Sequence, residues 1–159
     1  EIQLSTTFLN VIVDREKFYK DEQKYLCWIF DNFSTLPEDQ KFTDKDILYS
    51  NNCNVLVANE ETLRQSRRNR ELTLECHYLE PRKPTNASNP IEHNWRTKTV
   101  RFSELTIDGE GYRLFYFDYE NKLREIEKGI EEVREAEIQR ELAVRRKEEE
   151  NLKKNGSII

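Results

Sequence analysis

The sequence has 159 residues, enough for one domain but too few for two domains of ordinary size. Hydrophobic and charged residues each make up 36%, and no run approaches the roughly 20 consecutive apolar residues that a membrane span requires. Residues 1–120 hold 16 basic and 21 acidic residues, an acidic balance that argues against a general nucleic-acid binder.

Aromatic residues divide the chain into two parts. All eight Phe, seven Tyr and two Trp lie at or before Tyr119, so residues 1–120 can form a packed core despite the low hydrophobic average. Residues 121–154 hold ten basic and ten acidic residues and few large apolar ones. We therefore expect a globular α+β head over 1–120, followed over 121–159 by a helix with a frayed tail.

The first 33 residues predict a helix that follows either a strand or a lead-in segment. Residues 1–13 indicate a strand or the lead-in to a helix, and Asp14 is typical of an N-cap. Apolar residues then recur at helical spacing opposite polar ones, which predicts a helix over about 15–33. Pro37 falls in the following loop.

Short elements follow in quick alternation. Thr43 is expected to cap a helix through Leu48, and Asn51-Asn52 marks a turn. We predict a short strand over 54–58 and, capped by Asn59, a helix over 60–69.

Residues 72–79 alternate in polarity, which predicts a strand with one wet face that carries Thr73, Glu75 and His77. Residues 80–94 contain three prolines and predict a long loop. Two β-prone runs, 97–107 and 112–119, flank Asp108-Gly109, so we expect a hairpin in which Gly109 accepts positive φ. Because the second run is apolar on both faces, we place it at the centre of the sheet.

From Glu120 onward the pattern predicts one long, charged helix. Its apolar residues drift around the axis, which fits a nearly straight helix better than a strict heptad seam. We expect the turns through about Ile130 to pack on the head and the rest to project. The predicted partner-binding residues on this helix, as a coiled coil or shorter pairing, are Ile126, Ile130, Val133 and Ile138.

No catalytic, cofactor or metal site is expected. His77 lies two residues from Glu75, but no nucleophile accompanies the pair in the sequence. Two histidines and three scattered cysteines give no metal-ligand spacing, and the four glycines form no phosphate-binding loop. We therefore expect a protein that is not an enzyme and needs no cofactor.

The sharpest charge feature is a basic run over residues 64–70. It would serve as a patch for phosphate or an acidic partner, or as a solvated helix end whose arginines favour the dipole. The candidate binding residues in this run are Arg64, Arg67, Arg68 and Arg70.

Cysteine usage bears on location. Cys27, Cys53 and Cys76 are odd in number and form no CxxC pair, so we expect three free thiols and an intracellular, cytoplasmic or nuclear location. Sequons at Asn32, Asn86 and Asn155 keep a glycosylated lumenal domain as a weaker alternative.

These observations lead to one fold and two functions. The fold is α+β, with a small, mainly antiparallel sheet, flanking helices and a long C-terminal helix. The leading functional hypothesis is a non-enzymatic module for protein interaction or scaffold assembly, in which the head binds a partner and the C-terminal helix either self-associates as a homodimer or links the head to the rest of a larger protein. The alternative is a nucleic-acid or phosphate-binding domain that uses the basic run together with Arg82 and Lys83.

Overall fold

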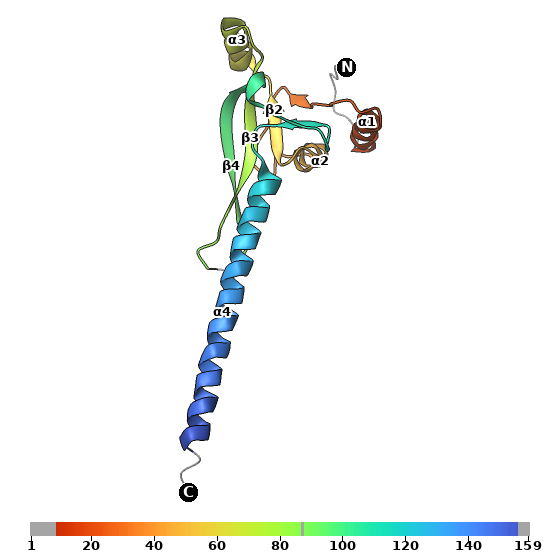
Figure 1. The fold of residues 1–159 in the computed structure, drawn as a ribbon. Coiled ribbons are helices and arrows are strands. Elements are labelled where there is room, and N and C mark those ends of the chain that lie inside the picture. Colours follow the sequence, from red (N-terminus) through yellow and green to blue (C-terminus); the bar gives the residue numbers. More distant parts are fainter. Residues whose placement is uncertain (1–8, 87, 156–159) are drawn as a thin grey trace. The chain divides into compact units, whose positions relative to one another are not determined.

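The computed structural model describes residues 9–86 and 88–155, and it confirms the α+β class (Figure 1). The helices are α1 (Leu9–Asp21), α2 (Phe42–Ser50), α3 (Glu60–Asn69) and α4 (Tyr119–Asn155), with a 3-10 turn η1 (Phe102–Glu104). The strands are β1 (Ile29–Phe30), β2 (Asn54–Val57), β3 (Thr73–Arg82), β4 (Glu92–Arg101), β5 (Thr106–Asp108) and β6 (Arg113–Phe115).

The chain forms two compact units. The head unit comprises Glu1–Glu80 and His93–Glu120, and the helix unit comprises Pro81–Glu92 and Asn121–Ile159. The long helix therefore begins in the head unit and continues in the helix unit. The tail over 156–159, where we expected fraying, and the start over 1–8 lie outside the described residues.

The main sheet has the order β1-β2-β3-β4, and β2 is its buried centre. β2 runs parallel to β1 and antiparallel to β3, with Leu56 opposite Cys76. Successive β2 side chains point to opposite faces. Leu56 packs with Leu74 and Cys76 in one apolar cluster, whereas the flanking Val55 and Val57 belong to a second. The sheet is therefore covered on both faces.

The predicted helix over 15–33 is wrong at both ends. Helix α1 begins at Leu9, and Gln23, at φ 54, follows its end in the left-handed conformation. The apolar run that follows supplies β1, whose Ile29 and Phe30 pair with Leu56 and Val57. A short aromatic run fits either element by spacing alone, and the exposed edge of β2 decides the outcome.

The next two helices differ in how well their starts were predicted. Helix α2 begins at Phe42 after Lys41, so Thr43 lies within the helix and does not cap it, contrary to expectation. The Asp44 carboxylate instead accepts the Lys41 amide at 2.9 Å. Helix α3 is confirmed from cap to end, because the Asn59 side chain accepts the Thr62 amide at 3.0 Å.

The predicted wet face of β3 is wrong. Thr73 is 2% exposed and His77 8%, since the second apolar cluster covers this face. Phe33 lies over His77, with ring centroids 5.5 Å apart. The predicted loop over 80–94 is also shorter than expected, because β3 continues to Arg82 and β4 begins at Glu92.

The hairpin at Asp108-Gly109 exists, but it forms a separate two-stranded sheet and not the centre of the main one. Positive φ falls on Tyr112, at 53°, and on neither glycine of the turn. Gly111 is needed for space, since a Cβ there would lie 2.5 Å from Asp108 Oδ2. The second run ends as a strand at Phe115, so it is not the central, doubly covered strand that we predicted.

Two buried asparagines join β2 to the segment that leads into α4. Asn54 is fully buried; its Nδ2 donates to the Phe117 carbonyl at 2.8 Å, and its Oδ1 accepts the Tyr116 and Phe117 amides at 3.1 and 2.9 Å. Asn52, 1% exposed, accepts the Glu120 amide at 2.8 Å and thereby caps the start of α4. These side chains replace the backbone ladder that a longer β6 would have made.

Asn54→Ala should lower the free energy of unfolding by at least about 3 kcal/mol, because it leaves several buried backbone groups without partners. The matched variant Asn59→Ala removes one half-buried helix cap and should cost only about 1 kcal/mol. Urea denaturation of both variants measures the difference. Equal losses would show that the Asn54 bonds do not hold this segment.

Candidate functional site

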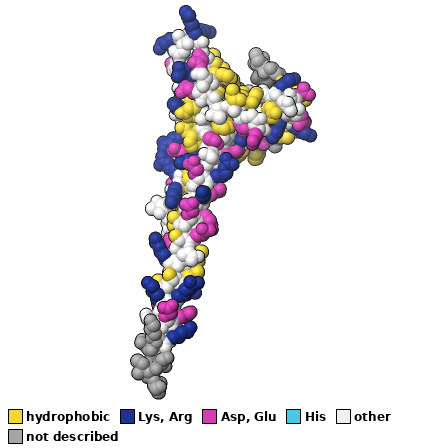
Figure 2. Space-filling model, viewed as in Figure 1, with side chains coloured by type: hydrophobic (Ala, Val, Ile, Leu, Met, Phe, Trp, Pro, Cys, Tyr) yellow, Lys and Arg dark blue, Asp and Glu magenta, His cyan; other side chains and the backbone are white. Residues whose placement is uncertain are grey.

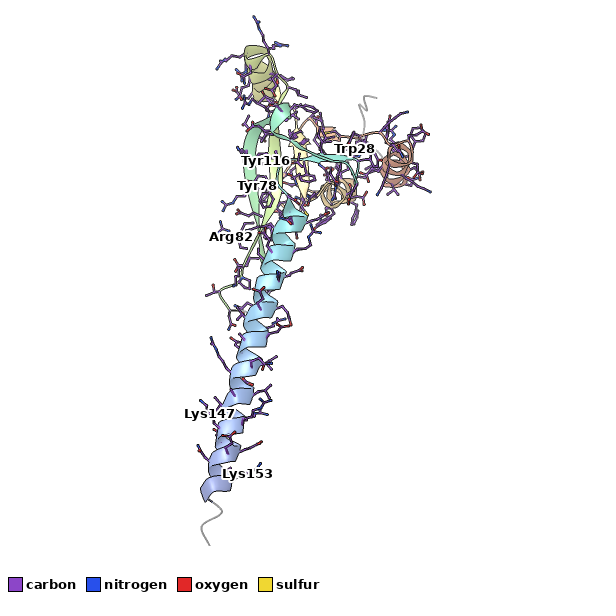
Figure 3. All side chains as sticks on the ribbon, in the orientation of Figure 1. Trp28, Tyr78, Arg82, Tyr116, Lys147 and Lys153 are labelled. Atoms are coloured by element: carbon purple, nitrogen blue, oxygen red, sulfur yellow. The ribbon has the colours of Figure 1, made fainter. Side chains whose placement is uncertain are left out.

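The distal part of α4 presents an exposed apolar stripe. Val133 is 37% exposed, Ile138 55% and Leu142 41%, and Val144 and Leu152 continue the stripe. Figure 2 shows apolar side chains along this helix among charges of both signs, and Lys147 and Lys153 project from it in Figure 3. Of the four helix residues predicted to bind a partner, Val133 and Ile138 are exposed, whereas Ile126 and Ile130 are 8% and 7% exposed.

The first turn of α4 is tied to the head unit by Arg113. Both guanidinium Nη atoms bind the Glu120 carboxylate, at 2.8 and 2.7 Å, and Nε donates to Asp108 Oδ2 at 2.8 Å. A bidentate pair of this kind is among the stronger ionic contacts in proteins. Glu120 therefore links β6 to the helix start.

The candidate arginines lie on the outward surface of α3, where dark blue side chains gather in Figure 2. Arg64, Arg67, Arg68 and Arg70 are all exposed. The opposite face of α3 is turned toward β3, because the Ser66 hydroxyl donates to the Thr62 carbonyl and accepts the Thr73 amide at 2.8 Å. The arginines therefore point away from the sheet. Arg64 pairs with Glu61 at 2.9 Å.

Arg82 and Lys83, which we grouped with these arginines, lie in the helix unit. The head unit supplies a different neighbour. The Phe102 amide donates to the Leu72 carbonyl at 2.8 Å, which places the η1 turn beside the end of α3. This contact joins residues distant in sequence and had no signal in the composition.

His77 is the centre of a hydrogen-bonded network that the sequence did not reveal. Its Nε2 lies 2.7 Å from Glu75 Oε1, and its Nδ1 lies 2.9 Å from the Thr97 hydroxyl. A hydroxyl, an imidazole and a carboxylate in this order resemble the groups used in acyl transfer. Phe33 packs against the His77 ring and Trp95 packs against Phe33, however, and both ring nitrogens have partners, so the network is well suited to join β3 to β4.

The three thiols are free, as predicted, and Cys53 and Cys76 are buried. Burial raises the pKa of Cys27 to about 11 and those of Cys53 and Cys76 to about 12. No group of three or more His, Cys, Asp or Glu side chains within 9–86 and 88–155 is arranged to hold a metal ion. None of the helices in those ranges combines the length and the apolar character needed to cross a membrane.

Comparison with known proteins gives a family. A family model described as "Domain of unknown function (DUF6035)" matches residues 1–120, three quarters of the chain. No curated protein and no solved structure matches. The matched range ends at Glu120, one residue after the start of α4.

Asp108→Asn should lower the free energy of unfolding by about 2 kcal/mol at pH 7, since hydrogen bonds to charged groups contribute about that much. The Gly111 amide, and next Arg113, hold the pKa of Asp108 below its ordinary value. A lowered pKa in the folded state stabilises above the unfolded pKa of about 4, and this stabilisation is lost as pH falls through the folded pKa.

The difference between wild type and Asp108→Asn should therefore shrink toward pH 3 in urea titrations. Glu110→Gln, in the same turn, is the matched control and should change stability little at either pH. A constant difference from pH 7 to pH 3 would contradict the ionic contribution of Asp108.

The native thiols should resist alkylation at pH 8. The thiolate is the reactive form, and a pKa of about 11 makes it roughly a hundredfold scarcer than the ordinary value of 9.0. Intact-mass measurement after iodoacetamide treatment should find the folded chain largely unmodified when the guanidinium-unfolded chain carries three adducts. Rapid modification of the folded chain would refute the burial of these thiols.

Proposed function

We propose that this chain, which belongs to the DUF6035 family, is a non-enzymatic assembly module that pairs through the distal part of α4 with the same segment of a second copy. The observation that carries the proposal is the exposed stripe from Val133 to Leu152. Exposed charge pairs within one helix contribute only about 0.2–0.5 kcal/mol each, so they stabilise an isolated helix weakly. An apolar partner would supply the burial that the distal helix lacks.

The burial of Ile126 and Ile130 moves the proposed contact toward the C-terminus. These two residues belong to the helix unit, in which Pro81 and Pro84 are also buried. Since their side chains are already covered within the chain, they have little apolar surface to offer a partner. The apolar residues left exposed on the distal helix are Val133, Ile138, Leu142, Val144 and Leu152, and the proposed contact centres on Ile138 and Leu142, which share one face.

Charge distribution favours a second copy in antiparallel orientation. Residues 131–141 hold five acidic and two basic residues, whereas residues 142–153 hold three acidic and four basic ones. Antiparallel pairing places the acidic half of one helix beside the basic half of the other, and parallel pairing places like beside like. Charges that flank an apolar seam set partner orientation in this way.

A two-fold axis near Leu142 is compatible with this orientation. It would place Leu142 beside its own copy, with Ile138 one turn away on the same face of the helix. The same axis would bring Glu131 toward Lys153.

Replacing Ile138 and Leu142 with Asp should convert the dimer to a monomer whose head remains folded, because two buried charges would oppose the pairing. Gln139→Asp with Ala143→Asp is the matched control, since these neighbours point about 100° away around the helix and add the same charge. Sedimentation equilibrium measures the mass, and circular dichroism checks folding. A wild-type chain that is monomeric at high micromolar concentration would refute self-association.

Cysteine cross-linking tests the orientation. In the antiparallel dimer, Glu135→Cys alone should form no disulfide, and a mixture of Glu135→Cys and Glu149→Cys chains should form mixed dimers, because these positions lie opposite each other on the face of Leu142. Efficient cross-linking of Glu135→Cys to itself would indicate parallel pairing. The native thiols, held protonated by burial, should not interfere.

A further inference from the structure

The end of α3 and the adjacent η1 turn form a surface that combines unpaired cations with an exposed aromatic ring. We propose that this surface binds single-stranded nucleic acid, with arginines on the phosphates and Phe102 stacked on a base. The inference goes beyond the assembly function and does not rest on it. We call this surface the arginine–Phe102 patch; it consists of Arg67, Arg68, Arg70, Arg101 and Phe102.

Three arginines of the patch keep a positive charge that no carboxylate of the described residues neutralises by a direct ion pair. Arg67, Arg68 and Arg70 are exposed, and none of them forms an ion pair with another residue of the described ranges. Arg67 and Arg68 lie in the last turn of α3, and Arg70 follows as its C-cap, with φ 54. Side chains on consecutive positions there fan outward, so they can reach successive phosphates.

Phe102 provides the feature that distinguishes this patch from an ordinary solvated helix end. Its side chain is 43% exposed, although a large aromatic residue is normally buried. Its amide donates to the Leu72 carbonyl, two residues beyond Arg70, and Leu72 is itself 40% exposed. An exposed aromatic ring on a segment beside cationic side chains can stack on an unpaired base, because every base offers a stacking face.

Acidic neighbours limit the strength of the patch without cancelling it. Glu71 accepts the Ser103 amide at 2.9 Å, and Glu104 accepts the Arg101 amide at 2.8 Å and lies 3.5 Å from Arg101 Nε. Arg101 is therefore partly neutralised, and three arginines carry the net positive charge. Since the whole chain has a net charge of −5, binding should be weak and steeply dependent on salt.

Single strands are favoured over duplexes by the chemistry of the ring. A duplex offers phosphates to the arginines but keeps its bases stacked, so Phe102 would add little. A single strand offers both phosphates and free base faces. If Phe102 stacks on a base, the patch should prefer a single strand to a duplex, a preference that an arginine cluster alone would not produce.

The experiment measures fluorescence anisotropy of a labelled 20-nucleotide oligo-dT and of a 20-base-pair duplex, at 50 and 200 mM salt. Arg67→Gln, Arg68→Gln and Arg70→Asn together should weaken oligo-dT binding at least tenfold and flatten the slope of log K against log salt by about 2, since each phosphate contact contributes about 0.7. Asn tolerates the left-handed conformation at position 70, so the fold should be retained.

The matched control removes three exposed lysines from α1 and the segment after it: Lys17→Gln, Lys20→Gln and Lys24→Gln. These lie in the same unit but away from α3 in Figure 1, so binding should fall far less. Phe102→Leu should weaken oligo-dT binding about tenfold and leave duplex binding unchanged, because loss of one stacked base costs roughly that much.

Two results would overturn the proposal. Equal losses in the arginine and lysine variants would show a diffuse charge effect, and unchanged oligo-dT binding by Phe102→Leu would remove the stacked base. Melting curves exclude unfolding as a cause of either loss. The monomeric Ile138→Asp, Leu142→Asp chain should bind with the same salt slope, so the outcome is separable from that of the assembly proposal.

Discussion

The turn before β2 is the constraint on which the head unit depends. Asn52 and Asn54 present side-chain amides where no strand continues, and these amides receive the backbone of residues 116–120. To do so the chain places Asn52 and Cys53 at φ 53 and 56, a left-handed pair that non-glycine residues adopt at a cost. The hydrogen bonds offset that cost. The side chains of one short turn thus fix the end of the hairpin and the beginning of α4.

The doubly covered sheet follows from the same arrangement. Once residues 116–118 are held across β2, Tyr116 and Phe117 lie over Tyr78, with the Phe117 and Tyr78 rings stacked 4.8 Å apart (Tyr78 and Tyr116 are labelled in Figure 3). The hairpin then covers one face with Leu114, while Leu48 and Phe33 cover the other. The buried His77 is hydrogen-bonded to Glu75 and Thr97, so both of its ring nitrogens have partners.

The sequence predicts those features whose causes are local. Asn59 and Thr62 satisfy each other across one turn, so helix α3 could be predicted from cap to end. Helix α4 has no proline and a sustained apolar spacing, and it too was predicted. The predictions that failed concern features with tertiary causes. Strand β1 forms because it pairs with the edge of β2, and His77 is buried because Phe33 packs over its ring. At the candidate surfaces, the charge of the arginines was enough to predict that they are exposed. The burial of Ile126 and Ile130 and the contact of Phe102 with Leu72 could not be predicted from the sequence.

The Asn54–Phe117 bond also orders events in time. It joins residues 63 positions apart, and the Asn52–Glu120 bond that caps α4 joins residues 68 positions apart, so both become possible only after the chain has been made through residue 120. During synthesis these contacts therefore form later than any contact between residues of the main sheet can. A ribosome that stalls before residue 116 would therefore hold a sheet whose buried asparagines still lack their partners. Such an intermediate is open to solvent at the centre of the head, where chaperones recognise unfinished chains.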